Sequence, residues 1–397
     1  MWRGLFPAVA LAVACLTEPC VAGGLRPFTS ADDSVAFRLN PARTNSINFS
    51  SGFSPSLKLA WSVYDPNFNF YNTIVAGGTV FVVDHGAGKE LLRAFRLSDG
   101  RNIWNRQIKS PPLANGAAAY DNGSLFVVDV FAKLWSVSAQ TGKINWSLKI
   151  PKQKVGQTDP VAVNGTIFGM AYTTAGYSAM YSVLESTGTL QWRTELYNVY
   201  YTWLAYDGNN GLYENSPCNY YKLDATTGMT IWFDNPDGCH GGGNTPPIYI
   251  DGRILIQDPV VDPARIILYD AANGRQMGRH LASVDYPPTA YTDASGASHV
   301  VSLSSDTNTL TDWDLRTRKD NWSFSGGGFG MPVVVNGIVF APSGADVFVF
   351  DGANGNLLND LHVTDCEHIF CPRLLLSAGD GALILNVGPE LLAYVPQ

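Results

Sequence analysis

The chain has 397 residues, of which 46% are apolar, 12% aromatic and only 15% charged, and it contains 39 glycines. This composition excludes a disordered chain, because the apolar residues can build a core, and it favours strands over helices. The net charge of −8, without a dense run of Lys and Arg, argues against a nucleic-acid partner.

The first residues have the pattern of a secretory signal. Arg3 precedes an apolar stretch at residues 5–16 that is too short to span a bilayer, and Cys20-Val21-Ala22 places small residues at a cleavage site. We therefore expect residues 1–22 to be a signal peptide cleaved after Ala22, and the mature protein to be secreted. No later stretch is long and apolar enough to predict a membrane span.

One pattern recurs along residues 57–397: an apolar strand, a turn ending in Gly, three further residues and then Trp. It is present in SDGRNIW, AQTGKINW, ESTGTLQW and DATTGMTIW, and in altered form in DAANGRQMG, DLRTRKDNW and DGANGNLLN. The turns recur every 37–46 residues, which is typical of a four-stranded propeller blade. Gly accepts the positive φ of such a turn, and we expect the Trp to pack in the seam between neighbouring sheets. The motif residues are Trp61, Gly100, Trp104, Gly142, Trp146, Gly188, Trp192, Gly228, Trp232, Gly274, Trp322 and Gly355, with Arg318 at the Gly position of one repeat.

A second series of eight turns alternates with the first and predicts a hairpin between the first two strands of each blade. These turns are Gly77-Gly78, Asn122-Gly123, Asn164-Gly165, Asn210-Gly211, Asp251-Gly252, Ser295-Gly296, Asn336-Gly337 and Gly379-Asp380.

The two ends of the repeat region complement each other. Residues 57–63 form one isolated strand around Trp61, whereas residues 374–394 supply three strands and no fourth. Pairing them closes a ring and removes the free sheet edges. The sequence therefore predicts an all-β, eight-bladed β-propeller of four-stranded antiparallel blades, closed by an N-terminal strand; an open array, or seven blades with a terminal hairpin, is the alternative. We expect the polar residues 23–56 to form an extended lead-in that lies on the propeller of residues 57–397.

The strings SDGRNIW, AQTGKINW, ESTGTLQW and DATTGMTIW resemble the pyrroloquinoline-quinone propeller repeat, and the resemblance covers roughly residues 57–397. That family includes quinoprotein alcohol dehydrogenases and the propeller lipoprotein of the bacterial outer-membrane barrel-assembly machinery. Because the repeat motif is structural, the resemblance implies the propeller fold and leaves the function open.

Both turn series lie on one face of the predicted ring, here called the turn face. The opposite face, here called the loop face, carries the longer and more variable connections at residues 64–71, 149–157, 197–203, 235–246, 286–288, 325–332 and 364–372. Variable loops on a rigid ring usually carry function. The aromatic residues there predict either a stacking surface for a glycan, a peptide or a quinone, or a cap over the central channel. The candidate binding residues are Tyr64, Asp65, Tyr71, Tyr200, Tyr201, Trp203, His240, Tyr286, Asp365 and His368.

Four cysteines follow the predicted cleavage site, an even number that indicates two disulfides in a secreted chain. Their places in the repeats favour Cys218 with Cys239 and Cys366 with Cys371, which would stiffen loops of the loop face; free buried thiols are the alternative. Sequons that permit N-glycosylation are present at Asn48, Asn122, Asn145, Asn164 and Asn321.

The sequence contains neither a GxSxG nor an HExxH string. We therefore expect a secreted, non-catalytic, monomeric propeller that binds or scaffolds a protein or glycan partner on its loop face, without a cofactor.

The first alternative is a divergent quinoprotein dehydrogenase, for which the family implies pyrroloquinoline quinone with calcium, a stacking Trp and a catalytic Asp. The adjacent cysteine pair of the family's alcohol dehydrogenases is absent from this sequence. The second alternative is a glycoside-acting enzyme with two convergent carboxylates. The acid candidates are Asp65, Asp237, Asp285 and Asp365, of which Asp65, Asp237 and Asp365 are also the calcium candidates.

Overall fold

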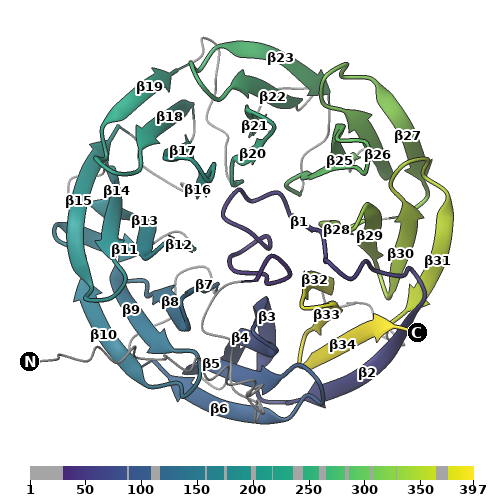
Figure 1. Ribbon diagram of the computed structural model, residues 1–397, viewed down its shortest axis with the longest axis horizontal. Coiled ribbons are helices and arrows are strands. Elements are labelled where there is room, and N and C mark those ends of the chain that lie inside the picture. The colour runs from purple at the N-terminus through teal and green to yellow at the C-terminus, as the bar shows by residue number, and fades with distance from the viewer. Residues whose placement is uncertain are drawn as a thin grey trace, which may run out of the picture.

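Eight sheets are arranged around a common axis as the blades of a ring (Figure 1). The strands within each blade are antiparallel, and the short β1 (Ser46–Ile47) adds a parallel strand to one blade beside β28 (Val333–Val335). The computed structural model describes residues 30–397 except 87–88, 109–116, 157–158, 174–176, 198–202, 217, 236–244, 259–264, 282–285, 305–306, 328 and 364–373. The predicted eight-bladed propeller of four-stranded blades is confirmed. Over the described residues, no helix is long and apolar enough to cross a membrane.

Each blade runs from an inner strand near the axis to an outer strand at the rim, as the order of hydrogen-bonded neighbours shows. Blade 1 contains β3 (Asn69–Ala76), β4 (Thr79–Gly86), β5 (Lys89–Arg96) and β6 (Asn102–Gln107). Blade 2 contains β7 (Ala119–Asp121), β8 (Ser124–Val128), β9 (Lys133–Ser138) and β10 (Ile144–Lys149). Blade 3 contains β12 (Val161–Val163), β13 (Thr166–Thr173), β14 (Ser178–Leu184) and β15 (Thr189–Leu196), with β11 (Gln153–Gly156) also paired to β13. Blade 4 contains β16 (Trp203–Tyr206), β17 (Gly211–Ser216), β18 (Asn219–Asp224) and β19 (Thr230–Asp234).

The second half of the ring repeats this order. Blade 5 contains β20 (Ile248–Ile250), β21 (Arg253–Asp258), β22 (Arg265–Asp270) and β23 (Gln276–Leu281). Blade 6 contains β24 (Thr289–Thr292), β25 (Ser298–Ser304), β26 (Thr309–Asp314) and β27 (Asp320–Ser325). Blade 7 contains β28 (Val333–Val335), β29 (Ile338–Ser343), β30 (Asp346–Asp351) and β31 (Leu357–His362). Blade 8 contains β32 (Leu374–Gly379), β33 (Ala382–Val387), β34 (Glu390–Pro396) and β2 (Leu57–Tyr64).

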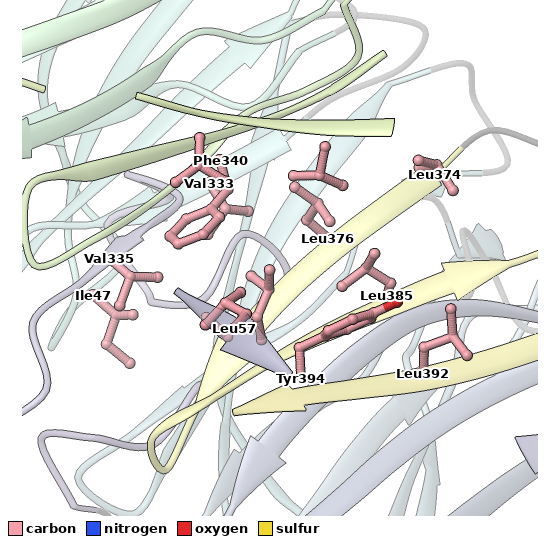
Figure 2. Packing of buried hydrophobic residues seen from close by; sticks show 14 of the residues in the cluster. Ile47, Leu57, Val333, Val335, Phe340, Leu374, Leu376, Leu385, Leu392 and Tyr394 are labelled. Atoms are coloured by element: carbon pink, nitrogen blue, oxygen red, sulfur yellow. The ribbon is translucent and has the colours of Figure 1, made fainter. Parts of the chain in front are cut away.

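The two ends of the repeat region build blade 8 together, as the sequence predicts. β2 pairs antiparallel with β34 in a register that runs from Leu57 opposite Pro396 to Tyr64 opposite Glu390. Buried apolar side chains of this blade pack against those of blade 7 and against Ile47, which precedes both in sequence (Figure 2). The closure of the ring therefore has its own hydrophobic core in addition to the strand pairing.

Most hairpin turns lie where the sequence predicts them; in blade 4 the connection is residues 207–210 and Gly211 already begins β17, and in blade 8 the turn is shifted by one residue. Asn122 and Gly123 have φ values of 45° and 75°, the positive pair that a type I′ turn requires. In blade 8 the turn residues are Asp380 and Gly381, with φ values of 48° and 78°, rather than Gly379-Asp380. Gly379 instead ends β32 and abuts Val75 of blade 1, where an added Cβ would lie 2.6 Å from the Val75 Cβ.

The motif Trp of one blade packs on the motif Gly of the next. Trp146 donates its indole Nε1–H to the carbonyl of Glu185 at 2.8 Å, and a Cβ added to Gly188 would lie 2.7 Å from the indole ring. Gly188 also has a φ of 70°. Gly is therefore required twice, for its backbone conformation and for the space that the ring needs. The same packing joins Trp61 to Gly100, Trp104 to Gly142, Trp192 to Gly228, Trp232 to Gly274 and Trp322 to Gly355.

The seam between blades 5 and 6 inverts this pair. Gly278 stands where the other motifs have Trp, and Arg318 stands where they have Gly, with a φ of 59°. The Arg318 Nη1 donates to the carbonyl of Met277 at 3.2 Å, and a Cβ added to Gly278 would overlap with this nitrogen. The Arg side chain thus fills the space that an indole occupies in the other seams.

Restoring the common pair in this seam tests that interpretation. We expect Gly278→Trp alone to lower the free energy of unfolding by about 1–3 kcal/mol, because the indole and Arg318 compete for one space. Adding Arg318→Gly should recover the loss, with a coupling of about 1 kcal/mol or more between the two sites in urea unfolding. Additive effects of the two substitutions would show that the Arg does not occupy the indole position.

Residues 30–49, here called the plug, fill the centre of the ring (Figure 1). The plug exchanges backbone hydrogen bonds with inner strands or their turns in seven blades: Ser34 N with Val75 O, Tyr120 N with Val35 O, Tyr206 N with Pro41 O, Tyr249 N with Ala42 O, Ala290 N with Thr44 O, Val334 N with Asn45 O and Asp380 N with Asp32 O. The eighth, blade 3, is reached by the Arg43 side chain, which bonds the carbonyl of Asp159 just before β12. The lead-in therefore enters the ring instead of lying on it, because the inner strands present unpaired backbone groups to the axis.

The plug enters and leaves on the turn face and reaches toward the loop face. At the turn face, the amide of Gly77 donates to the Asp33 carboxylate at 3.0 Å, and the amide of Phe49 donates to Asn336 Oδ1 at 3.0 Å. At the other end, Phe37 stacks on Trp203, the first residue of β16, with ring centroids 5.6 Å apart. Positive φ values of 60–69° at Arg38, Leu39, Arg43 and Asn45 fold this tip back on itself. Such backbone conformations cost about 1–2 kcal/mol each for residues other than Gly, so the surrounding contacts must hold them.

Candidate functional site

The loop face carries the predicted binding residues that the structure describes. Tyr64, at the end of β2, is 65% exposed, and Tyr71, in β3, is 39% exposed. Asp65, Trp203 and Tyr286 are also described, the last of them between blades 5 and 6. The predicted residues Tyr200, Tyr201, His240, Asp365 and His368 lie outside the described residues.

The described aromatic residues of the loop face differ in their surroundings. Trp203 stacks on Phe37 of the plug and so helps to cap the central channel. Tyr286 packs against the hydrophobic cluster between blades 6 and 7, and its carbonyl accepts a hydrogen bond from Gln257 at 3.3 Å. Tyr64 and Tyr71 keep a large exposed surface and can contact a ligand. Amphipathic Tyr rings exposed on a rigid surface are typical of protein-binding sites.

Asp65 is held in an ion-pair network that begins beneath the loop face. The Arg93 guanidinium lies 2.9 Å from Asp65 Oδ2 and also contacts the carboxylate of Asp84 in β4. The ring of Phe68 covers the guanidinium, with its centroid 4.5 Å from Arg93 Cζ. The network therefore ties the loop after β2 to the body of blade 1.

The pKa values of the two carboxyl groups in this network are shifted in opposite directions. Burial raises the pKa of Asp84 to about 7, although the Arg93 charge opposes that change. Partial burial also acts to raise the pKa of Asp65, but its hydrogen bonds and the Arg93 charge lower it below the ordinary value. Because Asp84 is fully buried, we assign it to positioning Arg93 rather than to acid–base chemistry. A calcium ion at Asp65 would have to displace or face the Arg93 cation.

The functional predictions from sequence missed a buried acid on the loop-face half of blade 4. Glu214, in β17, is buried, and neither carboxylate oxygen has a hydrogen bond of good geometry to the described residues. Burial raises the pKa of Glu214 to about 8, against a smaller opposing effect of the Ser216 hydroxyl. The available signal was its place in GLYENS, where Leu212, Glu214 and Ser216 share one side of a strand.

A second missed group lies inside the channel. Arg43 of the plug is fully buried and donates from Nε to the carbonyl of Leu204 at 3.0 Å, from Nη1 to that of Phe37 at 2.8 Å and from Nη2 to that of Asp159 at 2.9 Å. Burial lowers the pKa of Arg43 to about 10, with the Asp159 charge opposing the change, and burial raises the pKa of Asp159 to about 7. The polar lead-in gave no periodic pattern from which this role could be read.

The described residues do not gather into a metal centre. Among them, no group of three or more His, Cys, Asp and Glu side chains is close enough to share an ion. Of the calcium and glycosidase candidates, only Asp65 is described, while Asp237, Asp285 and Asp365 lie outside the described residues.

The predicted disulfides fall mostly outside the described chain. Cys218 is described and is disulfide-bonded. Cys239, Cys366 and Cys371 are not described, so the pairings Cys218 with Cys239 and Cys366 with Cys371 stay predictions.

The closed ring, its Trp–Gly seams and its variable loop face define a propeller of the pyrroloquinoline-quinone repeat type. Residues 88–324 match the family model described as outer membrane protein assembly factor BamB. The match spans more than half of the chain, and the chain belongs to this family of repeat propellers.

Solved structures of different activities share the fold. Quinohemoprotein alcohol dehydrogenase from Comamonas testosteroni superposes with a TM-score of 0.69 at 13% identity, over 92% of this chain and 80% of that chain. BamB from Moraxella catarrhalis superposes with a TM-score of 0.64 at 12% identity, over 85% of this chain and 97% of that chain. Identities this low show the shared fold alone.

A curated sequence relative has a third activity. Tetrathionate hydrolase from Acidithiobacillus ferrooxidans is 22% identical over 242 residues, which are 56% of this chain and 47% of that protein. The chain thus spans about half the length of this relative. An alcohol dehydrogenase, an assembly factor and a hydrolase therefore all resemble this chain, and the function has to be argued from its own site.

Proposed function

We propose that this protein is a non-catalytic scaffold that binds a protein partner on its loop face. The observation that carries the proposal is the plug, which fills the axis of the ring and contacts all eight blades. A propeller whose axis is filled by its own chain offers partners its outer surfaces, and the exposed Tyr64 and Tyr71 lie on the more variable of these. The family description as an assembly factor supports a protein rather than a glycan as the partner.

The residues at the loop-face end of the channel do not fit a quinone cofactor at the axis. Phe37 stacked on Trp203 occupies the loop-face end of the channel, and Asp65 is paired with Arg93. Calcium prefers several oxygen ligands, and no cluster of acids is available among the described residues. We therefore propose a function without pyrroloquinoline quinone and without calcium.

Export to an oxidising compartment is part of the same proposal. The basic Arg3 followed by the apolar residues 5–16 supports secretion with cleavage after Ala22. A disulfide at Cys218 supports an oxidising compartment, since such bonds are rare in the cytosol.

Site-specific photo-crosslinking tests the loop face directly. A photo-crosslinking amino acid in place of Tyr64 is expected to give a covalent adduct with one protein species in an extract of the source cells. The same amino acid in place of Met229 is the matched control, because Met229 is 69% exposed but lies beside a turn-face hairpin. Equal adducts from both positions, or none from Tyr64, would refute a loop-face partner.

Thermal unfolding separates this proposal from the dehydrogenase alternative. We expect the midpoint of the mature protein to stay unchanged when pyrroloquinoline quinone and calcium are added together. A ligand that binds only the folded state, at a hundredfold excess over its Kd, would stabilise it by about 2.7 kcal/mol. A clear rise in the midpoint of thermal unfolding would favour the quinoprotein dehydrogenase hypothesis, which an alcohol oxidation assay would then test.

A further inference from the structure

A small cavity lies beside the tip of the plug. Its volume is about 20 Å³, and it is bounded by Phe37, Arg38 and Asn45 of the plug together with residues of blades 7, 8 and 1. Space of this size holds one water molecule or one ion of comparable size. A quinone, a sugar or a polyatomic oxyanion is too large for it.

Arg38 contributes an unsatisfied charge to this cavity. The side chain is buried, and its Nη2 donates to the carbonyl of Pro288. Its Nε and Nη1 are buried without a hydrogen-bond partner among the described residues. An unpaired buried guanidinium is strongly unfavourable unless an acceptor or a counter-charge satisfies it.

Neighbouring side chains do not compensate the charge. Burial lowers the pKa of Arg38 to about 9, and the charge of Arg43, a second cation, lowers it in the same direction, so Arg38 stays charged at neutral pH. Asp159 is the acid that balances Arg43. Over the described residues, no carboxylate forms an ion pair with Arg38 within 4 Å, so the tip of the plug carries an excess of positive charge.

Other polar side chains that line the cavity already have hydrogen-bond partners in the protein; Asn45 Nδ2, for example, donates to the carbonyl of Pro332 at 2.5 Å. The Thr73 hydroxyl donates to Asn386 Oδ1 at 2.9 Å, the Ser377 hydroxyl donates to the carbonyl of Thr73 at 2.9 Å, and Asn386 Nδ2 donates to the carbonyl of Tyr71. This arrangement leaves Arg38 as the group in the cavity that needs a partner. A hydrogen-bond acceptor that carries one negative charge and is close to water in size would satisfy both nitrogens and also offset the positive charge.

We propose that the cavity is a binding site for a monovalent halide, under physiological conditions chloride, held by Nε and Nη1 of Arg38. The bound anion neutralises the tip of the plug where it meets blades 7, 8 and 1, and so holds the plug in the channel. This site is independent of the partner proposed for the loop face.

Halide-dependent stability tests the proposal in the full mature protein. At equal ionic strength, we expect the thermal midpoint to be higher in sodium chloride than in sodium gluconate by about 2 °C or more. Arg38→Met should lose this difference between the salts. Arg43→Met is the matched control: it should be less stable in both salts and keep the difference, because all three Arg43 nitrogens already have protein acceptors. Equal midpoints of the wild-type protein in the two salts would overturn the proposal.

A second measurement does not depend on whether Arg38→Met folds. Crystals of the wild-type protein grown in sodium bromide should show an anomalous peak in contact with Arg38 Nε and Nη1. A water molecule there, or a carboxylate from a neighbouring loop, would overturn the proposal. A bromide peak without a salt-dependent midpoint would mean an adventitious ion only and would equally overturn the stabilising role.

Discussion

Replacing Arg43 with methionine is expected to lower the free energy of unfolding by about 3–5 kcal/mol, the usual effect of removing one partner from a buried charged network. Met preserves much of the volume but donates no hydrogen bond. The substitution leaves the carbonyls of Leu204, Phe37 and Asp159 without their donor and leaves the buried Asp159 carboxyl without its counter-charge. Urea unfolding followed by tryptophan fluorescence measures the loss.

The pH dependence of that loss identifies its cause. Burial already raises the pKa of Asp159 to about 7 while Arg43 opposes the rise, so removing Arg43 should raise this pKa further. The destabilisation should therefore be larger at pH 8 than at pH 5. At pH 8 the unfolded chain ionises Asp159 freely, whereas in the folded variant the buried carboxylate lacks its counter-charge. Arg101→Met is the control, because Arg101 is exposed in a turn at the rim. A loss below about 1 kcal/mol, similar to that of an exposed site, would mean that the plug is not anchored through Arg43.

Glu214→Gln is expected to stabilise the protein at pH 8 and to change it little at pH 5. The pKa of Glu214 is raised to about 8 in the folded state from an ordinary value of 4.5. A raised pKa means that the folded protein binds the proton more tightly than the unfolded chain does, so stability is lost as the pH rises from about 4.5 to 8. The neutral amide of Glu214→Gln is not subject to this loss, which is about 4 kcal/mol at pH 8.

Unfolding curves of the two proteins at several pH values check this expectation. Glu195→Gln is the matched control, since that carboxyl is 55% exposed and pairs with Arg193 at the surface. Parallel curves for the wild-type protein and Glu214→Gln between pH 5 and pH 8 would show that Glu214 ionises freely in the fold.

The parts of the fold that follow from short sequence patterns could be predicted. The Trp–Gly spacing of SDGRNIW and its repeats reflects one local requirement, an indole against a left-handed turn, so it marks every seam where both residues are kept. The closing strand around Trp61 could be placed by the same spacing. The inverted seam shows the limit of this reasoning, because nothing local to Gly278 indicates that Arg318, from the next blade, fills its space.

The plug could not be predicted, because its partners are backbone groups of seven blades and have no sequence signature of their own. Arg38 and Arg43 differ from solvent-exposed arginines only through what surrounds them in three dimensions. The signal for Glu214 in the sequence is weak, a charged residue within a predicted strand, and the structure shows every residue of that strand buried. Tyr64 and Tyr71 could be placed on the loop face because the turns fix which connections lie there, but their partner cannot be read from two exposed rings.

The pairing of β2 with β34 has a consequence for the order in which the protein can fold. Leu57 and Gln397 are bonded although 340 positions separate them, and Asp380 completes the contacts of the plug. During synthesis, β2 and the plug therefore cannot complete their contacts until almost the entire chain has been made. Until then, apolar side chains such as Leu57 and Ile47 remain exposed. Folding limited by contacts this distant is slow and prone to aggregation. Such a nascent chain depends on protection until its last strand emerges, and a truncation within β34 would leave β2, at the other end of the repeat region, without its partner.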